Sequence, residues 1–247
     1  TLLVFDGAGE DVSTTLAVGA GTDLRVLRSI PWPHSLGHFY SAMTGFLGFA
    51  MLDGEYKMMG LAPYGSPDYL PFIRQNILLT DAPGSYRLNG DLLDYHAALK
   101  KQFHPKLLEA FGSPRLSDED PFTGRHRQIA ASAQAAFEEV VGDMASWAFQ
   151  QGGKRTNVAI AGGCGLNCSA NGKLLRDGPF TRMYVPPAPH DAGCAVGAAL
   201  LLHHERLGKP RQFEMTHAYY GPAYGEQDIG RALCALGLEA RPMADEE

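Results

Sequence analysis

The stretch Ala161–Leu175, AGGCGLNCSANGKLL, follows the apolar run NVAI and decides the class of fold. A buried strand that passes through glycines into a helix is the repeating unit of α/β proteins. Gly162, Gly163 and Gly165 allow the backbone to approach a ligand closely, and helix-terminal N–H groups together with Asn167 could hold a nucleotide. A tight turn without a ligand needs the same glycines, so these residues alone leave both interpretations open.

The four cysteines follow neither a metal-site pattern nor a disulfide framework. Cys164 and Cys168 lie four residues apart, but a zinc site normally needs two ligand pairs, and Cys194 and Cys234 are isolated. We interpret the first two as small packing residues. Sparse cysteines favour a reducing compartment, so we expect a cytoplasmic protein.

The composition is that of an ordinary globular protein, and it argues against two classes of partner. The 247 residues are 45% hydrophobic and 19% charged, with a formal net charge of −6. Nucleic acid is not an expected partner, because a phosphate backbone attracts a basic surface. No membrane span is expected either, since no apolar run reaches the roughly 18–20 residues that one needs. The chain begins with TLLVFDG, without Met and inside a strand pattern, and we expect a fragment of a longer protein.

Before the glycine-rich turn, the sequence predicts a meander, a buried helix and a loop-rich insertion. A strand over residues 1–5 ends at DGAGE, and two more follow at 12–21 and 23–30, so three sequential strands should pair antiparallel. Residues 35–52 are mostly apolar and predict a buried helix. Residues from about 64 to 123 are weakly periodic and rich in turn residues, which predicts short elements joined by loops.

The rest of the chain continues the α/β pattern. In residues 126–150, apolar side chains recur at spacings of three and four, which predicts an amphipathic helix. The apolar positions are Ile129, Ala133, Phe137, Val140, Met144 and Trp147, and the other face carries Gln134, Glu138 and Asp143. A strand at 182–187 and a helix at 191–208 should follow the turn. The tail from His217 predicts a connector and one amphipathic helix.

Other charged residues lie where a ligand could reach them. Asp6 and Gly7 follow the first strand, where a carboxylate beside glycines leaves room for phosphate or a metal-bound water, although Asp-Gly also marks hairpins. Asp191 begins a predicted helix, where an N-cap is the simpler role. Glu55 and Lys57 lie in an apolar, Gly-bounded segment. The lysine could neutralise phosphate, and a solvated helix end is the alternative.

The two histidines of HSLGH do not form a recognisable metal motif. His34 and His38 are four residues apart, a spacing that can place two ligands on one helix face, but no HExxH pattern accompanies them. We interpret both as core or capping residues.

Taken together, five segments resemble one family. FDGAGE, HSLGHFYSAMTGFLGF, GEYKMMGLAPYG, IAGGCGLNCSANGKL and PPAPHDAGCAVGAAL occur in the order typical of the NodU/CmcH-type O-carbamoyltransferases. The resemblance implies α/β lobes of the actin/sugar-kinase/heat-shock ATPase type, which are ribonuclease H-like. It also implies an enzyme in which a second, YrdC-like domain makes carbamoyl-adenylate from ATP and carbamoyl phosphate. The large domain then carbamoylates a hydroxyl of a sugar-containing, antibiotic or nodulation-factor acceptor.

The resemblance also implies roles for individual residues. Asp6 and Asp191 match aspartates that help to hold a divalent metal, typically iron. The nucleotide-binding positions are Gly7, Gly162, Gly163 and Asn167. Glu55 and Lys57 match an acidic and basic catalytic pair near the phosphates.

The resemblance further implies that parts of the enzyme lie outside these 247 residues. Residues 1–205 should belong to the TsaD-like carbamoyltransferase domain, and residues 206–247 should lead towards the YrdC-like domain. The family's His-x-x-x-His metal pair should precede Thr1, and HSLGH is not that pair. We therefore expect an incomplete metal site, no activity from the fragment alone, and an exposed sheet edge that could support a homo-oligomer.

Two other functions stay open at this point. One is a sugar-kinase-like phosphotransferase on the same fold, because a fold does not determine its chemistry. The other is a non-catalytic nucleotide-binding module.

Overall fold

A computed structural model describes residues 1–93 and 103–240 of the chain. The chain divides into two compact units, Thr1–Pro210 and Arg211–Glu247, which are described separately. The first unit holds the sheet and the residues of the candidate site. Within the described part of the second, Glu226–Ala235 forms the amphipathic helix α8, and the Gly225 N–H donates to the Asp228 carboxylate at 3.0 Å.

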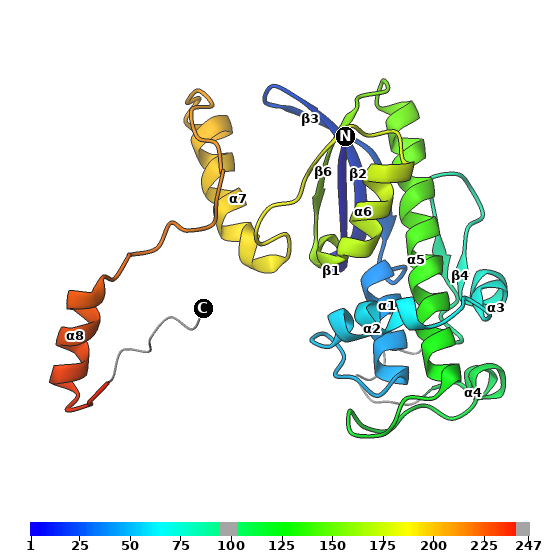
Figure 1. Ribbon diagram of the computed structural model, residues 1–247. Coiled ribbons are helices and arrows are strands. Elements are labelled where there is room, and N and C mark those ends of the chain that lie inside the picture. The colour runs from blue at the N-terminus through cyan, green and yellow to red at the C-terminus, as the bar shows by residue number, and fades with distance from the viewer. Residues whose placement is uncertain (94–102, 241–247) are drawn as a thin grey trace. The chain divides into compact units, whose positions relative to one another are not determined.

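Five strands of the first unit form one mixed sheet in the order β3-β2-β1-β6-β7 (Figure 1). They are β1 (Leu2–Gly9), β2 (Val12–Ala20), β3 (Asp23–Pro31), β6 (Asn157–Ala161) and β7 (Arg182–Tyr184). β1, β2 and β3 pair antiparallel, which confirms the predicted meander, whereas β1–β6 and β6–β7 pair parallel. The α/β class predicted from the sequence is therefore confirmed at the level of a mixed sheet covered by helices.

β1 continues past the point where the sequence predicts its end. DGAGE was expected to break the strand, but Gly9 still pairs with Val12 after an irregularity in register between Phe5 and Gly9. Such a bulge re-aims side chains without ending the strand. Asp6 lies in this irregular segment, so its direction is set by strand pairing as well as by its own turn.

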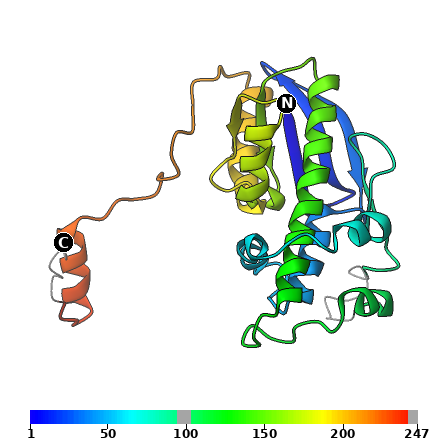
Figure 2. The same ribbon diagram turned by 45° about the vertical axis from the view of Figure 1, so that its right-hand side comes forward.

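The helices of the first unit flank the sheet and extend beyond it. They are α1 (Leu36–Phe46), α2 (Glu55–Leu61), α3 (Leu70–Asn76), α4 (Pro105–Phe111), α5 (Gly124–Gln151), α6 (Cys168–Asp177) and α7 (Cys194–Leu201). A short hairpin, β4 (Leu78–Leu79) with β5 (Arg87–Leu88), lies between α3 and α4. Figures 1 and 2 show α5 along one face of the sheet, with α6 beside it.

α5 is the helix that the apolar spacing predicted. Thr123 caps it, since its hydroxyl accepts from the His126 N–H while the His126 ring accepts from the Thr123 N–H. Five of the six predicted apolar positions are buried, and Trp147 is partly buried. The side chains of β1 and β6 that face this layer are also buried: Leu3, Phe5, Val158 and Ile160. Helix and sheet thus share one core.

The α-helices observed within 35–52 and 191–208 are shorter than the predicted ones. The helix expected over 35–52 ends at Phe46, because Gly48 takes a left-handed φ of 81° and breaks the helical path. Phe46, Leu47 and Phe49 are buried nonetheless, so the apolar run reports burial and not helix length. The helix expected over 191–208 is α7, preceded by a 3₁₀ turn at Asp191–Gly193 and followed by a π-helical turn at Leu202–Arg206.

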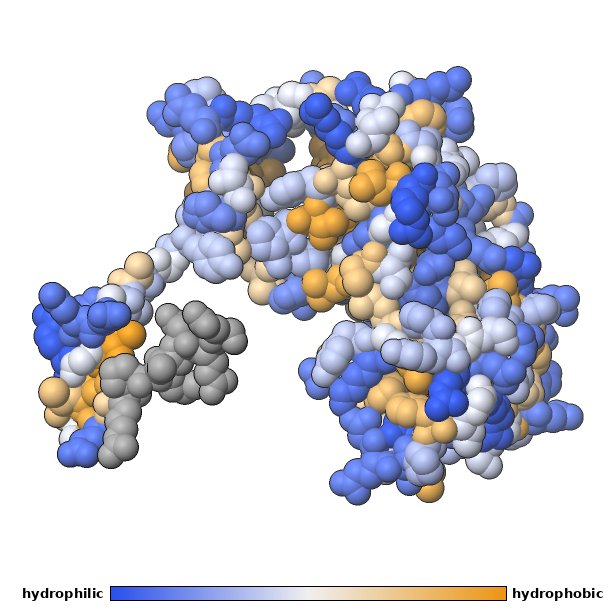
Figure 3. Space-filling view, viewed as in Figure 1, coloured by the Kyte–Doolittle hydropathy of each residue, from blue (hydrophilic) through white to orange (hydrophobic). Residues whose placement is uncertain are grey.

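The part of the surface seen in Figure 3 mixes hydrophilic and hydrophobic residues. Within residues 1–93 and 103–240, every helix is too short or too polar to cross a bilayer.

Gly162 allows β1 and β6 to approach closely at the end of the sheet, so a larger residue at this position should destabilise the fold. Its φ is 86°, and a Cβ at this position would lie 2.1 Å from the Phe5 carbonyl oxygen. Gly162→Ala should therefore lower the free energy of unfolding by about 2–4 kcal/mol, the sum of left-handed strain and overpacking. Urea denaturation of the chain measures this change.

Gly142→Ala is the matched control. Gly142 lies inside α5, where a Cβ would meet nothing within 4 Å, so the same substitution should stabilise the chain by up to about 1 kcal/mol. Equal effects of the two substitutions would contradict this account of the close approach.

Candidate functional site

The candidate site lies where β1 and β6 end side by side. Their parallel register pairs Val4 with Ala161, so Asp6, two residues further along β1, lies beside the glycines that follow Ala161. The Asp6 carboxylate accepts from the Gly7 N–H at 2.7 Å, and a Cβ on Gly163 would lie 3.0 Å from Asp6 Oδ1. In α/β sheets, ligands bind outside the carboxyl ends of parallel strands, and this edge is such a position.

The first turn of α1 is built directly onto Asp6 and Gly7. The Ser35 hydroxyl donates to the Asp6 carbonyl at 2.9 Å and accepts from the His38 N–H as the N-cap of the helix. Gly37 makes this possible, because a Cβ there would lie 2.7 Å from the Gly7 nitrogen. The positive end of α1 therefore lies beside Asp6, where it favours negative charge.

His38 belongs to this edge, although sequence reasoning interpreted it as a core or capping residue. A Cβ on Gly7 would lie 3.5 Å from His38 Nε2, and the imidazole also packs edge-on against Trp32 at 4.9 Å between centroids. His34 has the structural role that was predicted, since its Nδ1 accepts from the Leu88 N–H at 3.3 Å.

The glycine-rich turn is held between β1 and the loop that leads to Asp191. The Gly162 N–H donates to the Pro189 carbonyl at 2.7 Å, and a Cβ on Gly165 would lie 3.2 Å from the Pro189 side chain. These contacts bring the segment PPAPH to the edge occupied by Gly162 and Gly163. Two sequence-predicted segments are therefore adjacent, and Asp191 follows Pro189 by two residues.

Asn167 is used by the fold itself. It caps α6, because its Oδ1 accepts from the Ala170 N–H at 3.0 Å. Its side-chain amide also pairs with that of Gln134 through two hydrogen bonds of 3.0 and 3.1 Å. Tyr40 adds its hydroxyl to Gln134 Oε1 at 2.6 Å. The oxygen and the nitrogen of the Asn167 side chain are therefore both engaged by protein groups.

Glu55 and Lys57 point to different partners. Glu55 Oε1 accepts from the Ser41 hydroxyl and from the Leu52 N–H, whereas Lys57 pairs with the carboxylate of Asp118. Residues two apart on a helix do not face each other. The hydrogen bond to Asp118 raises the pKa of Lys57, which stays protonated at neutral pH.

The structure also separates two roles proposed for Asp191. The 3₁₀ turn is capped by His190, whose Nδ1 accepts from the Ala192 N–H at 3.3 Å, and not by Asp191. Asp191 is exposed, and within the described residues no hydrogen bond or ion pair holds its carboxylate. The simple N-cap interpretation therefore does not describe Asp191.

Cys164 lies among the acidic groups of this edge as a neutral thiol. Burial raises its pKa, and the negative charges of Asp6 and then Glu55 raise it further. Over residues 1–93 and 103–240, no group of three or more His, Cys, Asp or Glu side chains is arranged to hold a metal ion.

Sequence reasoning placed Gln134 and Glu138 on the polar face of α5 and gave them no role. Gln134 is buried, and its Nε2 also donates to Glu138 Oε1 at 2.8 Å, while Glu138 Oε2 accepts from Lys173 at 3.0 Å. The signal was available in the spacing, because two polar residues four apart lie on the same face of a helix. The partner, Asn167, lies more than thirty residues away and is not evident from that helix.

The chain is similar to known proteins over most of its length. Residues 1–200 match the family model described as carbamoyltransferase N-terminus. The chain is 42% identical to nodulation protein NolO of Bradyrhizobium diazoefficiens over 229 residues, which cover 91% of the chain and 39% of the relative. It is 38% identical to nodulation protein NolNO of Sinorhizobium fredii over 240 residues, covering 96% and 33%. It is also 42% identical to the uncharacterized protein sll1178 of Synechocystis sp., covering 97% and 39%.

The chain thus spans about two fifths of the length of NolO and of sll1178, and a third of the length of NolNO.

Asn167→Ala should destabilise the fold. The substitution removes the cap of α6 and leaves the buried Gln134 amide without two hydrogen bonds, so the free energy of unfolding should fall by about 2–4 kcal/mol. Asn167→Ser keeps a side-chain acceptor for the cap and loses only the hydrogen bonds to Gln134, so a smaller loss is expected. Urea denaturation distinguishes the three proteins. An Asn167→Ala chain as stable as the wild type would contradict the structural role.

Alkylation of the four cysteines should report the environment of Cys164. The thiolate is the reactive form, and the raised pKa keeps Cys164 protonated at pH 8. Iodoacetamide should modify the exposed Cys168, Cys194 and Cys234 in the folded chain and spare Cys164. Mass spectrometry of peptides measures this, with the urea-unfolded chain as the control in which all four react. Modification of Cys164 at the rate of Cys168 in the folded chain would refute it.

Proposed function

The chain belongs to the carbamoyltransferase N-terminal family, and from this premise we propose that it is the carbamoyl-transferring part of an O-carbamoyltransferase. The observation that carries the proposal is the match over residues 1–200, which includes every segment that meets at the carboxyl ends of β1 and β6. The donor is carbamoyl phosphate, activated with ATP as carbamoyl-adenylate. The acceptor is a hydroxyl of a sugar-containing, antibiotic or nodulation-factor molecule.

We also propose that the first unit is a ribonuclease H-like lobe of the actin/sugar-kinase/heat-shock ATPase type. An antiparallel meander extended on one side by parallel strands, in the order β3-β2-β1-β6-β7, is the arrangement expected of such a lobe. Residues 1–205 would be part of the carbamoyltransferase domain, and residues 206–247 would connect it to a YrdC-like domain that makes carbamoyl-adenylate. The matched relatives are longer than this chain, so they have room for the rest of the carbamoyltransferase domain and for a YrdC-like domain.

The transfer step is an attack on a carbonyl carbon. The acceptor oxygen forms a bond to the carbamoyl carbon, the bond from that carbon to the phosphate oxygen of AMP breaks, and the hydroxyl proton leaves to a base. The charge that develops on AMP must be stabilised. The N-terminal end of α1 and the backbone of Gly7, Gly162 and Gly163 are proposed to face the phosphate.

Glu55 and Lys57 have different proposed parts in this step. Glu55 is held by the Ser41 hydroxyl and the Leu52 N–H, which fixes the direction of its carboxylate. Lys57 forms a half-exposed ion pair with Asp118, and exposed pairs contribute only about 0–1 kcal/mol. The lysine can therefore leave Asp118 for a phosphate at little cost in free energy.

The described residues would supply only part of the proposed metal site. Carboxylates such as Asp6 and Asp191 suit a divalent transition metal such as iron when imidazoles accompany them. Among the described residues, no group of three or more His, Cys, Asp or Glu side chains is arranged to hold a metal ion, so a complete site does not fit this part of the chain. As proposed ligands, Asp6 and Asp191 would supply two carboxylates to the metal.

Asp191→Asn in the full-length enzyme tests the proposal. Because Asp191 is exposed and does not cap its helix, the substitution should change stability by no more than about 0.5 kcal/mol. Transfer should fall by about a hundredfold or more, the scale of losing one charge-stabilising group. The assay supplies ATP, carbamoyl phosphate and a panel of hydroxyl acceptors, and mass spectrometry detects the added carbamoyl group.

Asp177→Asn is the control, since Asp177 is an exposed aspartate at the end of α6, and its variant should keep full activity. A fully active Asp191→Asn enzyme would remove Asp191 from the site. ATP consumption that phosphorylates the acceptor without carbamoyl transfer would instead indicate a kinase-like enzyme. Nucleotide binding without turnover would indicate a binding module.

A further inference from the structure

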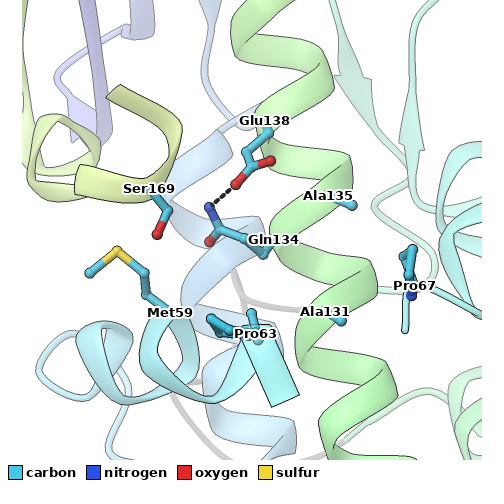
Figure 4. A pocket seen from close by; sticks show the side chains of 9 residues that line it. Met59, Pro63, Pro67, Ala131, Gln134, Ala135, Glu138 and Ser169 are labelled. Atoms are coloured by element: carbon cyan, nitrogen blue, oxygen red, sulfur yellow. Dashed lines mark hydrogen bonds between the residues drawn. The ribbon is translucent and has the colours of Figure 1, made fainter. Parts of the chain in front are cut away.

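A cavity of about 200 Å³ lies beside the glycine-rich turn, between α5, the start of α6 and the end of α2 (Figure 4). Its polar lining is Gln134, Glu138 and Ser169, and its apolar lining includes Met59, Pro63 and Ala135. In Figure 4, the side chains of Gln134 and Glu138 extend from α5 towards those of Met59 and Ser169. Cavities that enclose whole small ligands measure roughly 300–1,000 Å³, so this one fits a single ring of a larger molecule.

The charge of Glu138 selects the chemistry of that ring. Its carboxylate lies against the Lys173 ammonium at 3.0 Å, so its charge is already balanced and does not call for a cationic ligand. A carboxylate also repels phosphate, which excludes an anionic group. Glu138 uses one oxygen for Gln134 and the other for Lys173, but each carboxylate oxygen has a second lone pair. The remaining lone pairs accept from neutral donors such as hydroxyl groups.

The other walls fit the same class of ligand. The Ser169 hydroxyl can donate and accept, while Met59, Pro63 and the alanines of α5 present small apolar surfaces. A saturated ring with neighbouring hydroxyls offers both kinds of surface, polar at its edge and apolar on its C–H face. Ser169 is two residues from Asn167, and the Gln134–Asn167 hydrogen bonds join the cavity wall to the turn that starts at Gly162.

We propose that this cavity binds the diol-bearing ring of a ligand whose reacting end lies at the carboxyl ends of β1 and β6, with Glu138 accepting from the ring hydroxyls. This inference rests on the proposed function, because the ring belongs either to the nucleotide ribose or to a sugar of the acceptor. Both sources present neighbouring hydroxyls on a saturated ring, so the experiment must separate them.

Isothermal titration calorimetry of the full-length protein tests the cavity with three kinds of probe: ATP, 2′,3′-dideoxy-ATP, and the neutral tetrasaccharides maltotetraose, cellotetraose and chitotetraose. Glu138→Gln and the cavity-filling Ala135→Leu should weaken binding of the diol-bearing probe by about ten- to a hundredfold, the effect of losing a hydrogen bond to a charged group. Loss of the preference for ATP over the dideoxy nucleotide assigns the cavity to ribose. Loss of tetrasaccharide binding assigns it to the acceptor.

Glu139→Gln is the matched control, because Glu139 is the next residue of α5 and pairs with Arg74 away from this cavity. It should leave all affinities unchanged. If both cavity variants bind every probe as the wild type does, the inference is overturned. The carbamoyl-transfer assay of the wild-type protein distinguishes this failure from failure of the proposed function. If the enzyme transfers carbamoyl groups while both cavity variants bind normally, only the proposed binding of a ring in the cavity is wrong.

Discussion

The parallel pairing of β1 with β6 is the contact on which the rest of the site depends. Leu3 and Phe5 on one strand, and Val158 and Ile160 on the other, are buried on the same face of the sheet. A slip of one residue would turn these side chains to the opposite face, so the core determines the register. That register places Asp6 beside Gly163. The position of the candidate site is thus a consequence of burial, not of polar attraction.

The Asn167–Gln134 pair extends this constraint to the helices. Two amide groups buried together must satisfy each other, because an unpaired buried polar group lowers stability by about 1–3 kcal/mol. The pair holds α6 against α5. Because Gln134 also donates to Glu138, the same hydrogen bonds connect the glycine-rich turn to the wall of the cavity. Asn167 therefore holds the backbone of the turn at which we propose that a ligand binds.

Local patterns in the sequence predicted much of the fold, but tertiary contacts could not be predicted in the same way. The meander, α5 and the glycine-rich turn follow from periodicity and from glycine, both of which act over a few residues. The end of α1 depends on the left-handed Gly48, which an apolar run conceals. Lys57 meets Asp118 across 61 residues, and Gln134 meets Asn167 across 33. No local pattern records such partners, and the capping role of His190 is missed because Asp is the commoner cap.

We propose that a ligand of carbamoyl transfer binds at the edge shared by β1 and β6. Hydrogen–deuterium exchange of the full-length protein, with and without ATP and carbamoyl phosphate, tests it directly. The account predicts slower exchange in peptides that cover residues 5–10 and 161–168 when both compounds are present. Slower exchange confined to other parts of the chain, with these two segments unchanged, would contradict it.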